Sequence, residues 1–204
     1  MDNTAITVSV PIASFRVPHA REYFETLPCP PPSTVYGMLL SMVGEEQRAT
    51  HRGAELALAL LSRPLTSTVL RTMWRVKKKK QPLGVDKNRR PDFQELLSPV
   101  EIAVFVRPGA GEKAELSLCE RVSRALEQSA SVERHGALSL GESTHMVNDV
   151  TRWDGSSDAE GRVLLRDEQG PLCLPVWVDH VGSSDTRMQN YRLEESPLHM
   201  PLPE

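Results

Sequence analysis

The chain has 204 residues, which is enough for one domain with a sizeable core or for one domain with an appendage. Its 39% hydrophobic and 25% charged residues are typical of a globular protein, and the formal net charge of -3 excludes a uniformly basic chain. No apolar run approaches the ~20 residues that span a bilayer, and the polar start does not resemble a signal peptide, so we expect a cytoplasmic protein without a membrane partner.

The first part of the chain predicts a strand, a proline-rich loop and a helix. Residues 6–15 largely alternate apolar with polar side chains, a period of two that indicates a half-buried strand. Five prolines interrupt residues 16–32 and exclude a helix there. We expect Ser33 or Thr34 to cap a helix over residues 33–43, which Gly44 closes.

The next part predicts a long basic hairpin. Residues 53–61 are ambiguous, because their leucines alternate as in a strand while their composition favours a helix. Residues 66–76 are β-branched or alternating and indicate a strand, residues 86–90 indicate a turn, and residues 100–106 indicate a returning strand. We therefore expect a hairpin over about residues 66–106.

The strongest charge feature lies within this hairpin. The segment from Arg71 to Arg90 holds nine of the 24 Lys and Arg residues against one acid, Asp86, so a phosphate backbone would meet a locally positive field. The run from Lys77 to Lys80 alone fits a solvated loop tip equally well. Trp74 adds a stacking face beside the cations, which favours a single-stranded nucleic acid as the ligand. The nine cations are Arg71, Arg75, Lys77, Lys78, Lys79, Lys80, Lys87, Arg89 and Arg90.

The rest of the chain predicts one more helix and a second hairpin. Apolar residues recur at helical spacing over residues 114–128, whereas residues 136–150 are rich in Gly and Ser and indicate a loop. Residues 163–178 predict a hairpin at the edge of a sheet, because Pro175 lacks the N–H that an inner strand donates. We expect the proline-containing tail, residues 194–204, to be extended.

This order of elements predicts an α+β fold. Strand, helix, strand, strand, helix and strand is the ferredoxin-like (RRM-like) arrangement, here with a protruding β-hairpin and a small C-terminal β appendage. We expect residues 1–150 to form the nucleic-acid-binding domain and residues 151–204 to pack on it as a hairpin and tail. That fold supports many functions, so the order of elements alone does not identify one.

Catalytic and metal-binding patterns are weak in this sequence. The six histidines are scattered without a companion Cys or Ser signature, and the three cysteines are far apart, so we expect no catalytic residue, no metal and no cofactor. The loop at residues 141–145 is the exception. Gly141 permits a close backbone approach, and Ser143 and His145 could bond phosphates or base edges, although hydroxyls in such a loop equally well serve only to turn the chain.

Three segments together resemble one protein family. They are Phe15–Arg16 with PPPSTVYGML at residues 30–39, residues 70–77 with NRRPDFQELL at residues 88–97, and ALSLGES at residues 137–143. This combination resembles the CRISPR-associated Cas-five family, the RAMP-type subunits of type I surveillance complexes of the Cascade kind. The proline-to-helix segment is the most specific of the three.

The resemblance implies a ferredoxin-like core with a hairpin thumb that holds the five-prime repeat-derived handle of the CRISPR RNA and caps the complex. It implies contacts with the backbone and large subunits, an indirect role in reading target DNA, and a strand at residues 56–61. Arg16 and the loop at residues 141–145 would form a second wall of the RNA groove. The expected RNA-binding residues are Arg16, Tyr36, Arg71, Trp74, Arg75, Lys77, Lys78, Lys79, Lys80, Lys87, Arg89, Arg90, Gly141, Ser143 and His145.

Some members of the family cut precursor RNA with a tyrosine late in the first helix, a lysine and a histidine. Here the second half of that helix has no tyrosine, and Tyr36 lies near its start, so we expect a non-catalytic subunit in which Tyr36 packs or contacts the handle. Two alternatives remain open. One is a metal-independent endoribonuclease that processes precursor CRISPR RNA. The other is an assembly protein whose basic hairpin meets an acidic partner.

Overall fold

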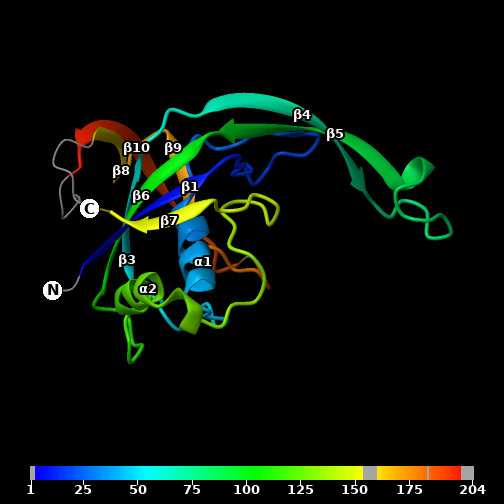
Figure 1. Ribbon diagram of the computed structural model, residues 1–204. Coiled ribbons are helices and arrows are strands. Elements are labelled where there is room, and N and C mark those ends of the chain that lie inside the picture. Colours follow the sequence, from blue (N-terminus) through cyan, green and yellow to red (C-terminus); the bar gives the residue numbers. More distant parts are fainter. Residues whose placement is uncertain (1–2, 154–159, 183, 199–204) are drawn as a thin grey trace.

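The computed structural model describes residues 3–153, 160–182 and 184–198, which form an α+β structure with two sheets (Figure 1). Within these residues, the larger sheet has seven strands in the order β7-β1-β6-β3-β8-β10-β9. Its strands are β1 (Thr4–Val10), β3 (Glu55–Leu60), β6 (Val100–Arg107), β7 (Asp149–Arg152), β8 (Glu160–Arg166), β9 (Leu172–Trp177) and β10 (Arg187–Pro197). The smaller sheet has the order β2-β5-β4, with β2 (Tyr23–Phe24), β4 (Leu65–Trp74) and β5 (Arg89–Ser98).

The two faces of the larger sheet build two apolar clusters. In β6, Val100, Ile102 and Val104 point to the cluster shared with the helices, whereas Ala103 and Phe105 point to the opposite face. This alternation follows from the period of two along a strand. Strand β1, antiparallel to β6 over its whole length, alternates in the same way.

The first helix, α1 (Pro32–Met42), begins one residue earlier than expected. Its N-cap is Pro31, which provides no side-chain hydrogen bond, so the predicted cap at Ser33 or Thr34 is wrong. Pro32 occupies the first turn, where a helix needs no N–H from that residue and where the fixed φ of proline suits the helix. The end of the helix is as predicted, because Gly44 adopts a φ of 67°.

The second helix, α2 (Leu118–Glu127), is held at its start by a capping box. The Ser117 hydroxyl accepts a hydrogen bond from the Glu120 amide, and the Glu120 carboxylate accepts one from the Ser117 amide at 2.8 Å. Two donors that a helix leaves unpaired are thereby satisfied. A short 3-10 helix, η2 (Ser129–Ser131), follows it.

Strands β4 and β5 form a long antiparallel hairpin that extends away from the larger sheet (Figure 1). Its register runs from Leu65 opposite Ser98 to Trp74 opposite Arg89, and the 3-10 helix η1 (Asp86–Asn88) precedes β5. The prediction of the outgoing strand is confirmed, but the predicted return along residues 100–106 is wrong. That segment is β6, which pairs with β1 and β3 because its apolar residues are suited to both faces of a buried sheet.

The C-terminal part also differs from the expectation. Residues 163–178 do not form a hairpin, because β10 lies between β8 and β9 and pairs with both. Much of the segment that β10 occupies was not recognised as a strand from the sequence. Of the tail expected to be extended, residues 194–204, the part up to Pro197 belongs to β10, and residues 199–204 lie outside the described residues. The edge position of β9, which contains Pro175, is confirmed. Strand β8 pairs with β3, so these strands continue the same sheet.

Candidate nucleic-acid interface

The tip of the hairpin, residues 75–88, is organised by one buried amide. The side chain of Asn88 is fully buried, and its Oδ1 accepts hydrogen bonds from the amides of Lys77 and Lys78 at 2.9 and 2.8 Å. Its Nδ2 donates to the carbonyls of Lys78, Gln81 and Pro82 at 2.9, 2.7 and 3.2 Å. The backbone of the lysine run is therefore fixed from inside, and its side chains are left on the surface.

The charged side chains of the tip are exposed and largely without acid partners. Asp86 accepts a hydrogen bond from Gln81, and no ion pair joins it to a cation of the tip within the described part of the chain. Arg75 lies near the lysines and donates from Nε to the Lys87 carbonyl at 3.1 Å. The exposed cations of this surface are Arg75, Lys77, Lys78, Lys79, Lys80, Lys87 and Arg89.

Trp74 lies at the junction between β4 and the tip. Its side chain is 70% exposed, and one part of the ring covers Gly84, where an added Cβ would lie 2.8 Å from Trp74 Nε1. Gly84 has a φ of 77°, so a residue with a side chain would suffer both strain and a clash there. The ring is thus held against the tip while much of its surface remains available for stacking.

Arg71 lies nearer the base of the hairpin and is neutralised within the protein. Its Nη1 lies 2.8 Å from Glu142 Oε2 and also contacts Gln94 Oε1, and Gln94 Nε2 donates to Glu142 Oε1 at 2.8 Å. Gln94 is fully buried. This cluster attaches the loop at residues 141–145, called the glycine loop below, to the hairpin. Arg71 therefore has less charge to offer a phosphate than its position in the sequence indicates.

The glycine loop is also fixed to the segment that contains Arg16. Gly141 has a φ of 98°, and an added Cβ would lie 2.6 Å from the Ser14 carbonyl oxygen. His145 is buried, its Nδ1 accepts a hydrogen bond from the Ser14 amide at 3.1 Å, and burial lowers the pKa of its imidazole. Ser143 is exposed. The expected proximity of this loop to the Arg16 segment is therefore present, with His145 in a supporting position.

Three further predicted residues make contacts within the protein. The Arg16 guanidinium lies 4.0 Å from the Phe24 ring centroid and donates to the Ala20 carbonyl. Arg90 forms an ion pair with buried Asp92 at 2.7 Å. Tyr36 is buried and donates to the Arg48 carbonyl at 2.8 Å, and burial raises its pKa to about 12. Of the two outcomes expected for Tyr36, the structure has the packed one.

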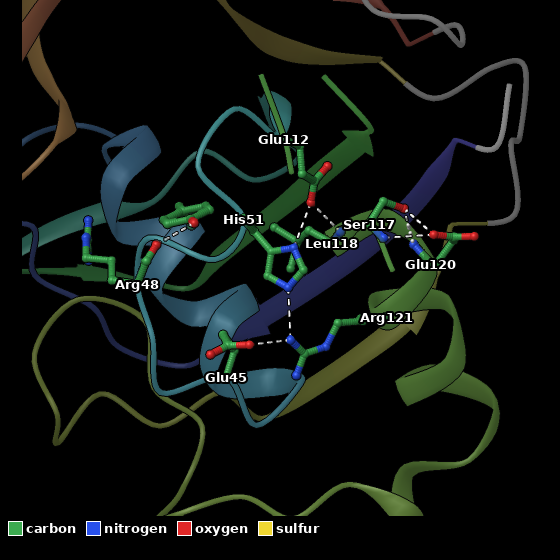
Figure 2. A network of polar contacts seen from close by, with 9 residues as sticks. Glu45, Arg48, His51, Glu112, Ser117, Leu118, Glu120 and Arg121 are labelled. Atoms are coloured by element: carbon green, nitrogen blue, oxygen red, sulfur yellow. Dashed lines mark hydrogen bonds and ion pairs between the residues drawn. The ribbon is translucent and has the colours of Figure 1, made fainter. Parts of the chain in front are cut away.

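A second charged cluster lies between the helices and is largely buried, with the side chains of Arg121 and Glu45 25% and 14% exposed (Figure 2). The fully buried His51 bonds through Nδ1 to Glu112 at 2.7 Å and through Nε2 to Arg121 at 2.9 Å. Because Arg121 is always a donor, Nε2 must accept and Nδ1 must carry the proton. Arg121 also pairs with Glu45 at 2.5 Å. Sequence reasoning missed this cluster, because nothing in the spacing of its members brings them together.

The hairpin tip and the cluster around His51 differ in what they can do chemically. The charged side chains around His51 bind one another inside the protein. The tip instead presents cations and an aromatic ring to the outside, an arrangement that suits an extended anionic ligand with stacking groups. Among the described residues, no three His, Cys, Asp or Glu side chains are grouped as metal ligands. No described helix has the length and apolar character to cross a membrane.

Comparisons with known proteins identify related chains. The chain is 46% identical over 196 residues to the CRISPR-associated protein Cas5 of Myxococcus xanthus (strain DK1622). The aligned region covers 94% of this chain and 90% of that protein. A chain of a CRISPR RNA-guided surveillance complex matches 96% of this chain and 89% of its own length with a TM-score of 0.65 and 13% identity. The match to a crystal structure of a Cas protein covers 97% of this chain and 95% of that chain, with a TM-score of 0.53 and 15% identity. No family model matches.

Proposed function

The chain belongs to the Cas5 family of CRISPR-associated proteins, and from this membership we propose that it is a non-catalytic RNA-binding subunit of a CRISPR surveillance complex. In this proposal the exposed tip of the hairpin binds the five-prime repeat-derived handle of the CRISPR RNA. The chain would cap a type I complex of the Cascade kind, and target DNA would be read by guide pairing, with this subunit acting indirectly.

The observation that carries the proposal is the exposed, uncompensated charge of the tip. Asn88 fixes the backbone of the lysine run, so the four lysines from Lys77 to Lys80 are displayed together on one short loop. Such a cluster of cations attracts phosphates whatever the sequence of the RNA. The neighbouring Trp74 ring gives an unpaired base a surface on which to stack. A single-stranded RNA handle combines both chemical groups.

The topology supports a ferredoxin-like core with the hairpin as its thumb. Taken in chain order, β1, α1, β3, β6, α2 and β7 follow the βαββαβ pattern, and their strands are adjacent in the order β7-β1-β6-β3. The hairpin of β4 and β5 is inserted between β3 and β6. We propose residues 1–150 as this RNA-binding domain, with its sheet extended by β8, β10 and β9.

The partners of the proposal are the backbone and large subunits of such a complex. The similarity in fold to a chain of a CRISPR RNA-guided surveillance complex supports an assembly of this kind. The exposed hairpin gives a neighbouring subunit access to both its tip and its sides (Figure 1).

The alternative, a metal-independent endoribonuclease, has less support. Such an enzyme needs groups that deprotonate a ribose 2′-hydroxyl and protonate the leaving oxygen. Tyr36 already donates its hydroxyl hydrogen to the Arg48 carbonyl, and His145 Nδ1 already accepts from the Ser14 amide. Neither group can act as a general base without giving up that internal hydrogen bond.

One assay separates the proposal from its alternatives. The full chain is incubated with labelled repeat RNA in chelator, and bound and cleaved RNA are resolved on native and denaturing gels. We expect retention without cleavage. Cleavage at one site, lost in Tyr36→Phe or His145→Ala, would replace the proposal with the ribonuclease. The absence of both binding and cleavage would favour an assembly protein.

A further inference from the structure

Two adjoining cavities lie where the loop after α1 meets β9. The larger, about 570 Å³, is lined by residues that include Arg52, Lys113, Trp177 and Arg187. The smaller, about 230 Å³, is lined by residues that include Tyr36, Trp177 and Tyr191. Arg52, Gly53, Val176 and Trp177 line both, so the two cavities form one depression with a cationic part and an aromatic part.

Positive charge predominates in the larger cavity. Arg52 and Arg187 share one acid, Asp185, at 3.4 and 3.1 Å, and Asp185 does not line the cavity. Lys113 is exposed and has no ion pair within the described part of the chain. Three cations therefore face one cavity against a single neighbouring carboxylate, which favours an anion there.

The aromatic side of the depression is fixed in place. The guanidinium carbons of Arg48 and Arg52 lie 5.0 and 4.9 Å from the centroid of a Trp177 ring, and the Tyr36 ring centroid lies 6.1 Å from that of Trp177. Guanidinium groups that stack on an aromatic ring keep their N–H edges free for oxygen acceptors. Arg52 is thus oriented before any ligand arrives.

The buried cluster of His51 explains why the loop holds this shape. Arg48, His51 and Arg52 belong to one loop, in which His51 bonds inward to Glu112 and Arg121 (Figure 2). The two arginines of this loop lie over Trp177. The inward anchor fixes the backbone from which the arginines project. Lys113 follows Glu112 directly, so the same anchor also positions the opposite wall.

We propose that this depression binds a nucleotide, with a phosphate group at Arg52, Lys113 and Arg187 and the base in the aromatic part beside Tyr36 and Tyr191. The combined size is within the usual range for a small-ligand pocket, and a few convergent polar groups beside an apolar lining are the usual composition of one. The ligand is either a free nucleotide or the terminal nucleotide of an RNA strand, since both present the same groups.

The inference is independent of the proposed function. No residue of β4, β5 or the hairpin tip lines either cavity. Loss of RNA binding in a hairpin variant and loss of nucleotide binding in a cavity variant would therefore be separate results. Each result identifies which of the two sites has failed.

The test is calorimetric titration of the full chain with adenosine 5′-monophosphate, adenosine and inorganic phosphate. We expect the nucleotide to bind at least about tenfold more tightly than either fragment. The variants Lys113→Ala and Arg187→Ala should each weaken nucleotide binding about tenfold, as expected for one lost hydrogen bond to a charged group. Arg63→Ala removes a cation that lines neither cavity and should leave binding unchanged.

A second arm identifies the source of the nucleotide. Short oligoribonucleotides with and without a 5′-phosphate are titrated into wild type and Lys113→Ala. Phosphate-dependent binding that the variant loses would identify an RNA end, whereas binding of the free nucleotide alone would identify a free ligand. Equal affinity for inorganic phosphate and nucleotide, or nucleotide binding insensitive to both variants, would overturn the proposal.

Discussion

The hairpin tip and the cluster around His51 both contain charged residues, but in opposite circumstances. In the tip, Lys77 to Lys80 are exposed, and only their backbone is held. In the cluster, Arg121 and Glu112 are bonded to the fully buried His51. The first arrangement leaves positive charge available to a ligand, and the second uses charge to fix a loop. Availability of charge, more than its amount, therefore distinguishes a binding surface from a structural one.

The largest expected effect concerns the buried cluster. Replacing Glu112 with Ala removes the acceptor for His51 Nδ1 and for the Leu118 amide, both of which it binds at 2.7 Å. We expect a loss of about 3 kcal/mol in the free energy of unfolding, because two N–H donors are left without their acceptor. Urea denaturation measures it. The exposed neighbour Glu115→Ala should cost less than about 0.5 kcal/mol, and equal losses in the two variants would remove the contrast between buried and exposed charge.

The next largest effect concerns Asn88, whose buried side chain holds the backbone of the exposed lysines. Asn88→Ala leaves the amides of Lys77 and Lys78 without their acceptor, and we expect a cost of about 1–3 kcal/mol together with weaker RNA binding. The variant Lys87→Ala changes an exposed neighbour, keeps the Asn88 side chain, and should retain the slow hydrogen exchange of the two amides, which Asn88→Ala loses. Unchanged exchange in Asn88→Ala would show that the tip does not depend on this side chain.

Trp74 tests whether the tip also binds bases. Trp74→Ala should weaken RNA binding by up to about 1–3 kcal/mol if a base stacks on the ring, while the salt dependence of binding stays the same. Trp74→Phe keeps an aromatic face and should recover part of the affinity. Fluorescence anisotropy at several salt concentrations measures both quantities. Loss of folding in Trp74→Ala would instead identify the ring as part of the hairpin's own packing.

The smallest effect concerns His145, which links the glycine loop to Ser14. Burial holds its pKa in the folded protein below the unfolded value of about 6.5, so the unfolded state binds more protons as the pH falls. The contribution of His145 to stability is present above pH 6.5 and is lost as the solution is acidified. His145→Gln should therefore show a smaller drop in unfolding free energy between pH 7.5 and pH 5 than wild type. His19→Gln, which replaces an exposed imidazole, should behave like wild type.

Periodicity predicted those elements whose faces differ in polarity. Strand β1, the outgoing strand β4 and helix α2 follow from apolar spacing, although β1 ends at Val10 and not at residue 15 as expected. Alternation correctly favoured a strand at residues 55–60. Strand β5 was missed in part because Arg89 to Asp92 are polar and contain a proline, as turns do. The place of β10 between β8 and β9 was missed because periodicity reports which face is buried and is silent about which strand is the neighbour.

The candidate site likewise contains residues that local sequence could predict and residues that it could not. The exposed cations of the tip and Trp74 were predicted from local composition. The partners that restrict other residues lie far along the chain, as Glu142 does for Arg71 and Ser14 does for His145. Asn88 lies within the basic segment, yet its role depends on a loop geometry that no spacing rule describes.

The salt dependence of RNA binding tests the central claim most directly. Each phosphate contact with a single strand contributes about 0.7 to the slope of log affinity against log salt concentration. Replacing Lys77, Lys78, Lys79 and Lys80 with Gln should weaken binding of repeat RNA and lower this slope by up to about 3. A control replaces four cations outside the hairpin, Arg63, Arg124, Arg152 and Arg192, and should keep the slope of the wild type. An unchanged slope in the lysine variant would contradict the assignment of the hairpin tip to RNA.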